Sequence, residues 1–273
     1  MALERTKKGN WANCLNQLGK RKLATASDLM QDRIKNYQNH IENGAWVAEN
    51  SNVVDGRFLL ARAKFNPLIK YAGQVVEAQV REEFYLNSEI VDTSGKPYKQ
   101  LLNEIAEVDA KKPSDKKRVA DLGKVVTHDV PTDCFADDKT IVFLAGGENL
   151  ANQYGLFLRN QLPEELKIQS VKVYHPSLSN KDFARGVWLY GLDGRSRSDF
   201  ECDGGDLYNV GGSVFGVSPI REVREAHAPK ISESKIRISS IKDILRFSKD
   251  YIPSRDWKEF EKGLQERFSG KWK

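Results

Sequence analysis

A short apolar run that ends in two glycines is the feature that most constrains the fold of this chain. Residues 140–145 read Thr-Ile-Val-Phe-Leu-Ala, and Gly146 and Gly147 follow them. A continuous apolar run of this length, rich in β-branched and aromatic residues, indicates a buried strand. Glycines directly after such a strand let the backbone turn sharply into the next element. We therefore expect a central strand whose end opens into a loop.

Helix and strand patterns alternate after this run. Residues 149–162 carry apolar side chains at helical spacing, and residues 168–174 alternate in hydrophobicity as a strand does. Residues 187–190 form another candidate element, and residues 235–239 predict one more strand. Strand, glycine turn, helix and strand make a βαβ unit, which implies parallel strands with helices on their faces. The prediction is an α/β fold with a parallel or mostly parallel sheet flanked by helices.

The first part of the chain shows helical spacing instead. Residues 25–43, 56–84 and 99–109 predict helices, the first of them capped by Thr25 or Ser27. A proline inside the second pattern should divide it, because proline lacks the amide donor of a helix interior. We therefore expect a helical N-terminal region.

These patterns divide the chain into two parts. Residues 1–124 form a mainly helical N-terminal region, and residues 125–273 form the α/β domain. The domain ends in a predicted amphipathic helix, Arg255–Phe268, with an aromatic stripe along one side. That stripe indicates core packing or, alternatively, a docking face for a partner protein.

The composition limits the class of protein. Twelve Phe, nine Tyr and five Trp supply enough apolar surface for a folded core. A net charge of +5, from interspersed residues of both signs, permits contact with nucleic acid or an anionic membrane without requiring either. No apolar run approaches the roughly 20 residues that span a bilayer, so no transmembrane segment is predicted.

Cysteine usage and the N-terminus bear on location. Cys14, Cys134 and Cys202 are odd in number and widely spaced, which is typical of reduced thiols rather than of a disulfide framework. Residues 1–10 are charged and lack the apolar core of a secretory signal. We expect a cytoplasmic protein, or one that is secreted into a host cell without a conventional signal peptide.

The apolar run, its glycines and the following helix and strand resemble the start of an α/β-hydrolase-like domain. Such domains occur in secreted effectors of intracellular bacteria, and the resemblance spans residues 140–245. It implies that the amides of Gly146 and Gly147 bind an oxyanion or another part of a ligand. The alternative interpretation of the two glycines is a tight strand-to-helix turn without a ligand.

The resemblance also assigns a catalytic triad. Ser213 lies in the pattern Gly-x-Ser-x-x-Gly, one residue longer than the family's nucleophile elbow, and is the candidate nucleophile. Asp243 is the candidate acid and His227 the candidate base, although the family's histidine follows its acid. His175 and His128 are alternative bases, and each histidine is equally explained as an ordinary hydrogen-bonded residue. The domain would act on an ester or acyl substrate, or serve as a scaffold if the triad is degenerate.

Two further patterns have both a functional and a structural interpretation. Residues 199–206 place carboxylates as the first half of a calcium loop does, but Val210 stands where the closing Glu belongs, so a solvated acidic turn is the alternative. Lys20–Lys22 and Lys111–Arg118 are basic, which indicates solvated surface or nucleic-acid binding. We predict no metal and no cofactor.

Three function classes remain open on these patterns. The first is the hydrolase-like domain, either active or degenerate. The second is a non-enzymatic protein-interaction module, such as a bacterial effector or a phage component. The third is a nucleic-acid-binding protein that uses the basic stretches. The sequence identifies no partner and leaves enzymatic activity undecided.

Overall fold

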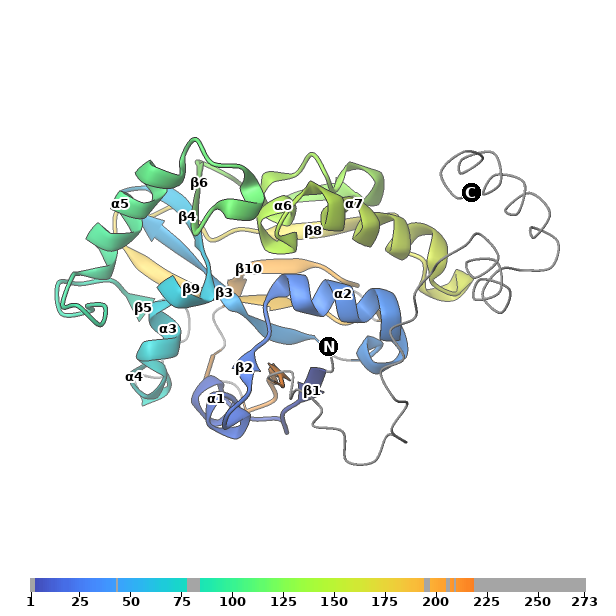
Figure 1. Ribbon diagram of the computed structural model, residues 1–273, viewed down its shortest axis with the longest axis horizontal. Coiled ribbons are helices and arrows are strands. Elements are labelled where there is room, and N and C mark those ends of the chain that lie inside the picture. Colours follow the sequence, from blue (N-terminus) through green and yellow to red (C-terminus); the bar gives the residue numbers. More distant parts are fainter. Residues whose placement is uncertain are drawn as a thin grey trace, which may run out of the picture. The chain divides into compact units, whose positions relative to one another are not determined.

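The computed structural model describes residues 3–42, 44–77, 84–193, 197–204, 207–208 and 210–218 (Figure 1). All of them belong to one compact unit, Met1–Arg221. The predicted strand at residues 235–239, the predicted helix Arg255–Phe268 and the predicted site residues His227 and Asp243 lie outside the described residues.

Helices and strands alternate along the described chain. The helices are α1 (Trp11–Leu18), α2 (Ala26–Asn36), α3 (Pro67–Lys70), α4 (Ala72–Glu77), α5 (Tyr98–Asp109), α6 (Lys139–Ala145) and α7 (Glu148–Leu156). A π-helical turn, Phe157–Gln161, continues α7, and 3₁₀ helices span Tyr37–His40, Ala63–Phe65, Ser114–Lys116, Thr132–Cys134 and Glu164–Leu166. The strands are β1 (Leu3–Arg5), β2 (Lys22–Leu23), β3 (Ala45–Val54), β4 (Arg57–Ala61), β5 (Phe84–Tyr85), β6 (Val119–Gly123), β7 (His128–Pro131), β8 (Ser170–Tyr174), β9 (Phe183–Leu189), β10 (Phe200–Gly204) and β11 (Phe215–Val217).

Most strands lie in one mixed, mainly antiparallel sheet. Its eight strands run in the order β6-β4-β3-β9-β10-β8-β7, and β5 pairs with the start of β9. Among these neighbours only β10 and β8 are parallel. A second sheet has three strands in the order β1-β11-β2. The predicted parallel or mostly parallel α/β sheet is therefore wrong, and strands from both sides of residue 124 lie in the same sheet.

The apolar run at residues 140–145 is helix α6, not a strand. The Asp138 side chain accepts a hydrogen bond from the Ile141 amide at 2.8 Å and so caps the start of the helix. Gly146, with φ at 78°, ends it in the left-handed conformation that glycine favours. Residues 140–145 are all buried. A helix that is apolar on every side has no helical period to read, so its pattern matched a buried strand and produced the βαβ prediction.

The predicted helix at residues 56–84 begins as a β-hairpin instead. Asp55 and Gly56 have φ of 51° and 69°, which suits the tight turn that joins two antiparallel strands. In β4, Phe58 and Leu60 then face one side of the sheet and Leu59 the other. The helices α3 and α4 occupy only the later part of this range.

Several other local predictions are confirmed. Thr25 caps α2 through a reciprocal hydrogen-bond pair with Asp28. The predicted helices at residues 99–109 and 149–162 correspond to α5 and to α7 with its π turn, and the predicted strand at residues 168–174 contains β8. None of the described helices is long and apolar enough to cross a membrane.

Each face of the large sheet buries its own apolar cluster. Helices α2, α6 and α7 pack on one face, and α1, α3, α4 and α5 contribute to the cluster on the other (Figure 1). Side chains alternate between the clusters along the strands, so that Val187 and Leu189 face α2, α6 and α7 while Trp46 and Ala184 face the opposite side. The second face is the one on which the candidate site lies.

A buried carboxylate ties α2 to the centre of the sheet. Glu49, on β3, is fully buried, and its Oε2 accepts a hydrogen bond from the Ala26 amide at 2.9 Å. Its Oε1 accepts one from Arg62 Nη1 at 3.1 Å. Burial raises the pKa of Glu49, and the Arg62 charge opposes that rise. The carboxylate therefore caps the start of α2 from the strand beneath it.

Helix α7 packs too closely on Thr132 to accept a side chain at Gly155. A Cβ there would lie 1.9 Å from the Thr132 carbonyl oxygen. We expect Gly155→Ala to destabilise the protein by about 3 kcal/mol, because backbone must move to relieve the overlap. Gly73→Ala in α4 is the matched control, since nothing lies within 4 Å of its Cβ, and it should be neutral or stabilising by up to about 1 kcal/mol. Urea unfolding of both variants measures the difference, and equal stabilities would contradict this packing.

Candidate functional site

A row of large side chains crosses the middle strands of the sheet. Trp46 on β3 lies directly opposite Trp188 on β9, and Trp188 lies opposite Glu201 on β10. Glu201 is in turn aligned with Tyr174 on the parallel strand β8. Residues directly opposite one another in a sheet project from the same face. The register therefore gathers two indoles, a carboxylate and a phenol from four strands.

Both neighbours of β9 are bulged at this row. Between Trp46 and Asn50, β3 advances four residues while β9 advances two, from Trp188 to Gly186. Between Glu201 and Gly204, β10 advances three residues against the same two of β9. Bulges bend the strand and redirect its side chains, and they are common beside functional sites.

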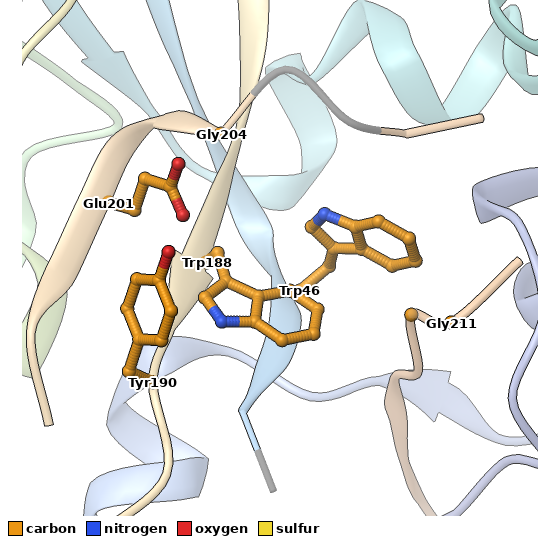
Figure 2. Close-up of a pocket in the computed structure, with 7 residues that line it drawn as sticks. Trp46, Trp188, Tyr190, Glu201, Gly204 and Gly211 are labelled. Atoms are coloured by element: carbon orange, nitrogen blue, oxygen red, sulfur yellow. The ribbon is translucent and has the colours of Figure 1, made fainter. Parts of the chain in front are cut away.

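The row opens into a cavity of about 250 Å³ (Figure 2). The indoles of Trp46 and Trp188 meet edge to face, with ring centroids 5.2 Å apart and planes at 79°. The ring of Tyr190 packs next to that of Trp188, with centroids 6.3 Å apart and planes at 74°. The cavity is lined by Trp46, Trp188, Tyr190, Glu201, Gly204, Gly211 and Gly212.

Tyr190 and Glu201 form the polar side of this aromatic pocket. The Tyr190 hydroxyl donates a hydrogen bond to the Glu201 carboxylate, and the two groups point toward each other in Figure 2. Burial raises the pKa of Tyr190 well above its usual value, and the nearby negative charge of Glu201 raises it further. The phenol therefore stays protonated at neutral pH and donates to the carboxylate.

Glycines make room for the two indoles. A Cβ at Gly212 would lie 1.9 Å from the Trp46 ring, and a Cβ at Gly44 would lie 2.4 Å from Trp188 Nε1. Distances this short exclude any side chain at either position without movement of the indole. The glycines therefore hold the tryptophans close to the backbone on both sides of the pocket.

Gly211 and Gly212 form one wall of the pocket. They belong to the described residues 207–208 and 210–214, which we call the wall segment. Main-chain hydrogen bonds attach it to the N-terminal residues. The amides of Trp11, Gly9 and Thr6 donate to the carbonyls of residues 207, 212 and 214 at 2.7, 2.9 and 2.9 Å. The Trp46 amide donates to the Ser213 carbonyl at 3.1 Å. Backbone atoms, more than side chains, thus fix the wall against the sheet.

The candidate nucleophile Ser213 is a buried part of this wall segment. Its side chain is fully buried. Its Oγ accepts a hydrogen bond from Arg5 Nε at 3.0 Å and donates one to the Gly44 carbonyl at 3.4 Å. His227 and Asp243 lie outside the described residues, so the triad stays a prediction, and these contacts give Ser213 a structural role.

Gly146 and Gly147 lie elsewhere, in the connection between α6 and α7. The Gly146 amide donates to the Phe143 carbonyl at 3.0 Å, and the Gly147 amide donates to the Val142 carbonyl at 2.9 Å. Both amides are therefore engaged in ending α6. The two glycines border a separate surface hollow with Asp115 and Glu148, and Ser213 is not part of its lining.

The alternative bases His128 and His175 pair with each other rather than with Ser213. Their rings stack with centroids 5.5 Å apart. His128 Nε2 lies 2.8 Å from Asp138 Oδ2, and His175 Nε2 lies 3.1 Å from the Thr140 hydroxyl. Burial, together with the charge of the neighbouring His128, lowers the pKa of His175 to about 4. Burial lowers the pKa of His128, but the hydrogen bond to Asp138 outweighs this effect, so the pKa of His128 is raised above its usual value.

The acidic and basic patterns are largely accounted for by the fold. Residues 200–204 of the acidic segment form strand β10, and the described residues contain no cluster of three or more His, Cys, Asp or Glu that could hold a metal ion. In the basic stretch, Arg118 and Lys112 both form ion pairs with Asp109, which is fully buried. Although burial opposes it, the hydrogen bonds from Arg118 and Lys112 lower the pKa of Asp109. These two cations are thus engaged within the protein.

No side chain of the aromatic pocket stands out as a site residue in the sequence. Trp188 and Tyr190 fall within a predicted element, and Glu201 falls within the acidic pattern, but Trp46 belongs to no predicted element. The Asp55-Gly56 pair is the signal that could have revealed β3, because Asp-Gly between apolar segments is typical of a hairpin turn.

Comparison with known proteins identifies the fold but not a family. No family model matches the chain, and no curated protein matches it. The chain is similar to a solved structure described as "Accommodation of massive sequence variation in Nanoarchaeota by the C-type lectin fold", with a TM-score of 0.57 and 11% identity over 80% of this chain and 98% of that one. The described residues therefore resemble a C-type lectin fold. The resemblance to α/β-hydrolase-like domains of bacterial effectors is wrong, because both the sheet topology and this match contradict it.

The glycine at residue 212 offers a direct test of the pocket geometry. We expect Gly212→Ala to destabilise the protein by about 1–3 kcal/mol, since the new methyl group overlaps the Trp46 indole. The near-ultraviolet circular dichroism and the tryptophan emission should change together with the unfolding free energy. A variant with unchanged spectra and stability would show that residue 212 does not contact Trp46.

The pKa values of the two stacked histidines should deviate from that of an ordinary histidine in opposite directions. On lowering the pH, His128 should gain its proton first, and His175 should remain neutral until about pH 4. The lowered pKa of His175 costs stability as pH falls from 6.5 towards 4, whereas the raised pKa of His128 adds stability below its own pKa. Because the charge on His128 helps to lower the pKa of His175, His128→Asn should lose stability less steeply than the parent protein between pH 6.5 and 4. It should also lack the gain in stability that the parent shows as pH falls towards 6.5. Histidine ring-proton NMR and unfolding at several pH values measure both effects, and a His175 that titrates above pH 6 would contradict its burial.

Proposed function

We propose that this chain is a non-enzymatic binding module and that the aromatic pocket is the place where its ligand docks. One observation carries the proposal: strand register and two bulges bring Trp46, Trp188 and Glu201 from three strands to a single cavity. Concave sites with aromatic walls and few polar groups are typical of ligand binding. Tryptophan and tyrosine also dominate the energetics of protein interfaces.

The chemistry of the lining favours binding over catalysis. Tyr190 and Glu201 are the titratable side chains that border the cavity within the described part of the chain. The phenol is held protonated and already donates to the carboxylate. Nucleophilic catalysis needs a nucleophile next to a base, and no described histidine, cysteine or lysine lines the cavity.

The construction of the pocket suits recognition. Main-chain hydrogen bonds to the N-terminal residues and to Trp46 hold the wall segment, so little ordering remains to be done when a ligand binds. In the similar structure, the fold is described as accommodating massive sequence variation. A fold that is retained at only 11% identity leaves the residues of its surface sites free to differ, so this chain can carry a binding site of its own.

The proposal is tested by screening the full chain for ligands and repeating the screen with pocket variants. The screen uses immobilised peptide and glycan arrays, and the variants are Trp188→Ala and Glu201→Gln. We expect ligands of the parent protein to bind Trp188→Ala at least about tenfold more weakly, because truncation of a buried aromatic anchor costs about 2 kcal/mol or more. Tyr85→Ala is the matched control, since Tyr85 is 45% exposed and does not border the cavity.

Two outcomes would overturn the proposal. One is a set of ligands whose affinity does not change in either pocket variant, because these ligands would then bind outside the aromatic pocket. The other is turnover of an ester panel that is lost in Ser213→Ala, since that result would return the chain to the hydrolases despite its fold.

A further inference from the structure

We infer that the aromatic pocket binds an organic ammonium ion: the charged end of a lysine side chain in its methylated form, or a free quaternary ammonium compound. This inference rests on the proposed binding function and specifies its ligand. It follows from three properties of the pocket, which are the arrangement of its rings, the sign of its charge and its size.

The rings are arranged as an aromatic cage. Trp46, Trp188 and Tyr190 follow one another at interplanar angles of 79° and 74° (Figure 2). Trp188 and Tyr190 are partly exposed and offer their rings to the cavity, whereas Trp46 is nearly buried and backs them. A cation is attracted to the faces of aromatic rings, most strongly to tryptophan, within about 6 Å of the ring centroid. Rings set at steep angles allow one ammonium group to contact more than one face, which a single flat stack does not.

The charge of the lining has the complementary sign. Glu201 is the charged side chain that borders the cavity in the described part of the chain. The charged groups that raise the pKa of Tyr190 are likewise acidic, namely Glu201 and Asp199. An anionic ligand would be repelled here. A neutral apolar ligand would displace water from the carboxylate and supply no charge in return, whereas a cation supplies the opposite charge.

The same face of the sheet already holds an ammonium group against an aromatic ring. Lys172 Nζ lies 5.6 Å from the ring centroid of Tyr174, which is the next residue of the row after Glu201. Lys172 does not border the cavity itself, so it does not occupy the proposed site. Its position shows that this surface accommodates a cation over an aromatic ring.

The size of the cavity restricts the ligand to a small group. Its volume of about 250 Å³ is below the roughly 300–1,000 Å³ of sites for drug-sized molecules. Gly204, Gly211 and Gly212 contribute backbone rather than side chains to its lining. Few hydrogen-bonding side chains are offered, and the Tyr190 hydroxyl is engaged with Glu201, so the pocket suits a compact group without many hydroxyls.

The experiment compares a cation with an uncharged molecule of the same shape. The full chain is titrated with choline and with 3,3-dimethylbutan-1-ol, in which carbon replaces the ammonium nitrogen, and tryptophan fluorescence and calorimetry report binding. We expect choline to bind at least about tenfold more tightly. Glu201→Gln should remove most of this preference, and Trp188→Ala should weaken choline binding, while Trp188→Phe, which keeps an aromatic face, should retain part of it.

A second arm identifies the source of the ammonium group. Short peptides that contain trimethyl-lysine, lysine or norleucine are titrated in the same way. Tighter binding of the trimethyl-lysine peptide than of choline would identify a protein partner, and the reverse order would identify a free quaternary ammonium compound. Glu89→Gln is the matched control for Glu201→Gln, because Glu89 is exposed and does not border the cavity.

The inference is overturned if the neutral molecule binds as well as choline, if Glu201→Gln leaves the preference unchanged, or if no ammonium compound binds. These failures are distinguishable from failure of the proposed function. If array ligands of another class lose affinity in Trp188→Ala, the pocket is a binding site and only its assignment to ammonium ions is wrong.

Discussion

The antiparallel pairing of β9 with β3 on one side and β10 on the other is the interaction on which the rest of the structure depends. It separates the two apolar clusters and aligns Trp46, Trp188 and Glu201 in one row. Because side chains alternate along a strand, a slip of one residue in β9 would turn Trp188 to the other face of the sheet, toward α2, α6 and α7. The pocket therefore exists only in this register, and the burial of Val187 and Leu189 under the helices enforces it.

The bulge that shapes the pocket also places a charge inside the protein. The extra residues of β3 include Glu49, which is fully buried and hydrogen bonds to the start of α2 and to Arg62. An uncompensated carboxylate at this position would be costly, so the arginine and the helix amide are needed partners. The same irregular stretch thus supports the site on one face of the sheet and anchors a helix on the other.

Local patterns predicted the parts of the fold whose signals are local. Thr25 begins α2, and the spacing of residues 99–109 matches α5, because caps and amphipathic faces depend on neighbours in sequence. Residues 140–145 misled the prediction, since a fully buried helix lacks a polar face and looks like a buried strand. The pocket was not predictable in this way: Trp46 and Trp188 are paired across 142 positions of sequence, and no periodicity reports such a register.

The attachment of the N-terminal residues to the wall segment has a consequence for biosynthesis. Arg5 bonds to Ser213, 208 residues later in the chain. At a translation rate of about 5–20 residues per second, the first strand waits roughly 10–40 s for its partner to be made. During that interval the Trp46 indole lacks the glycine backbone that packs on it, so the pocket can close only after residue 214 has been made.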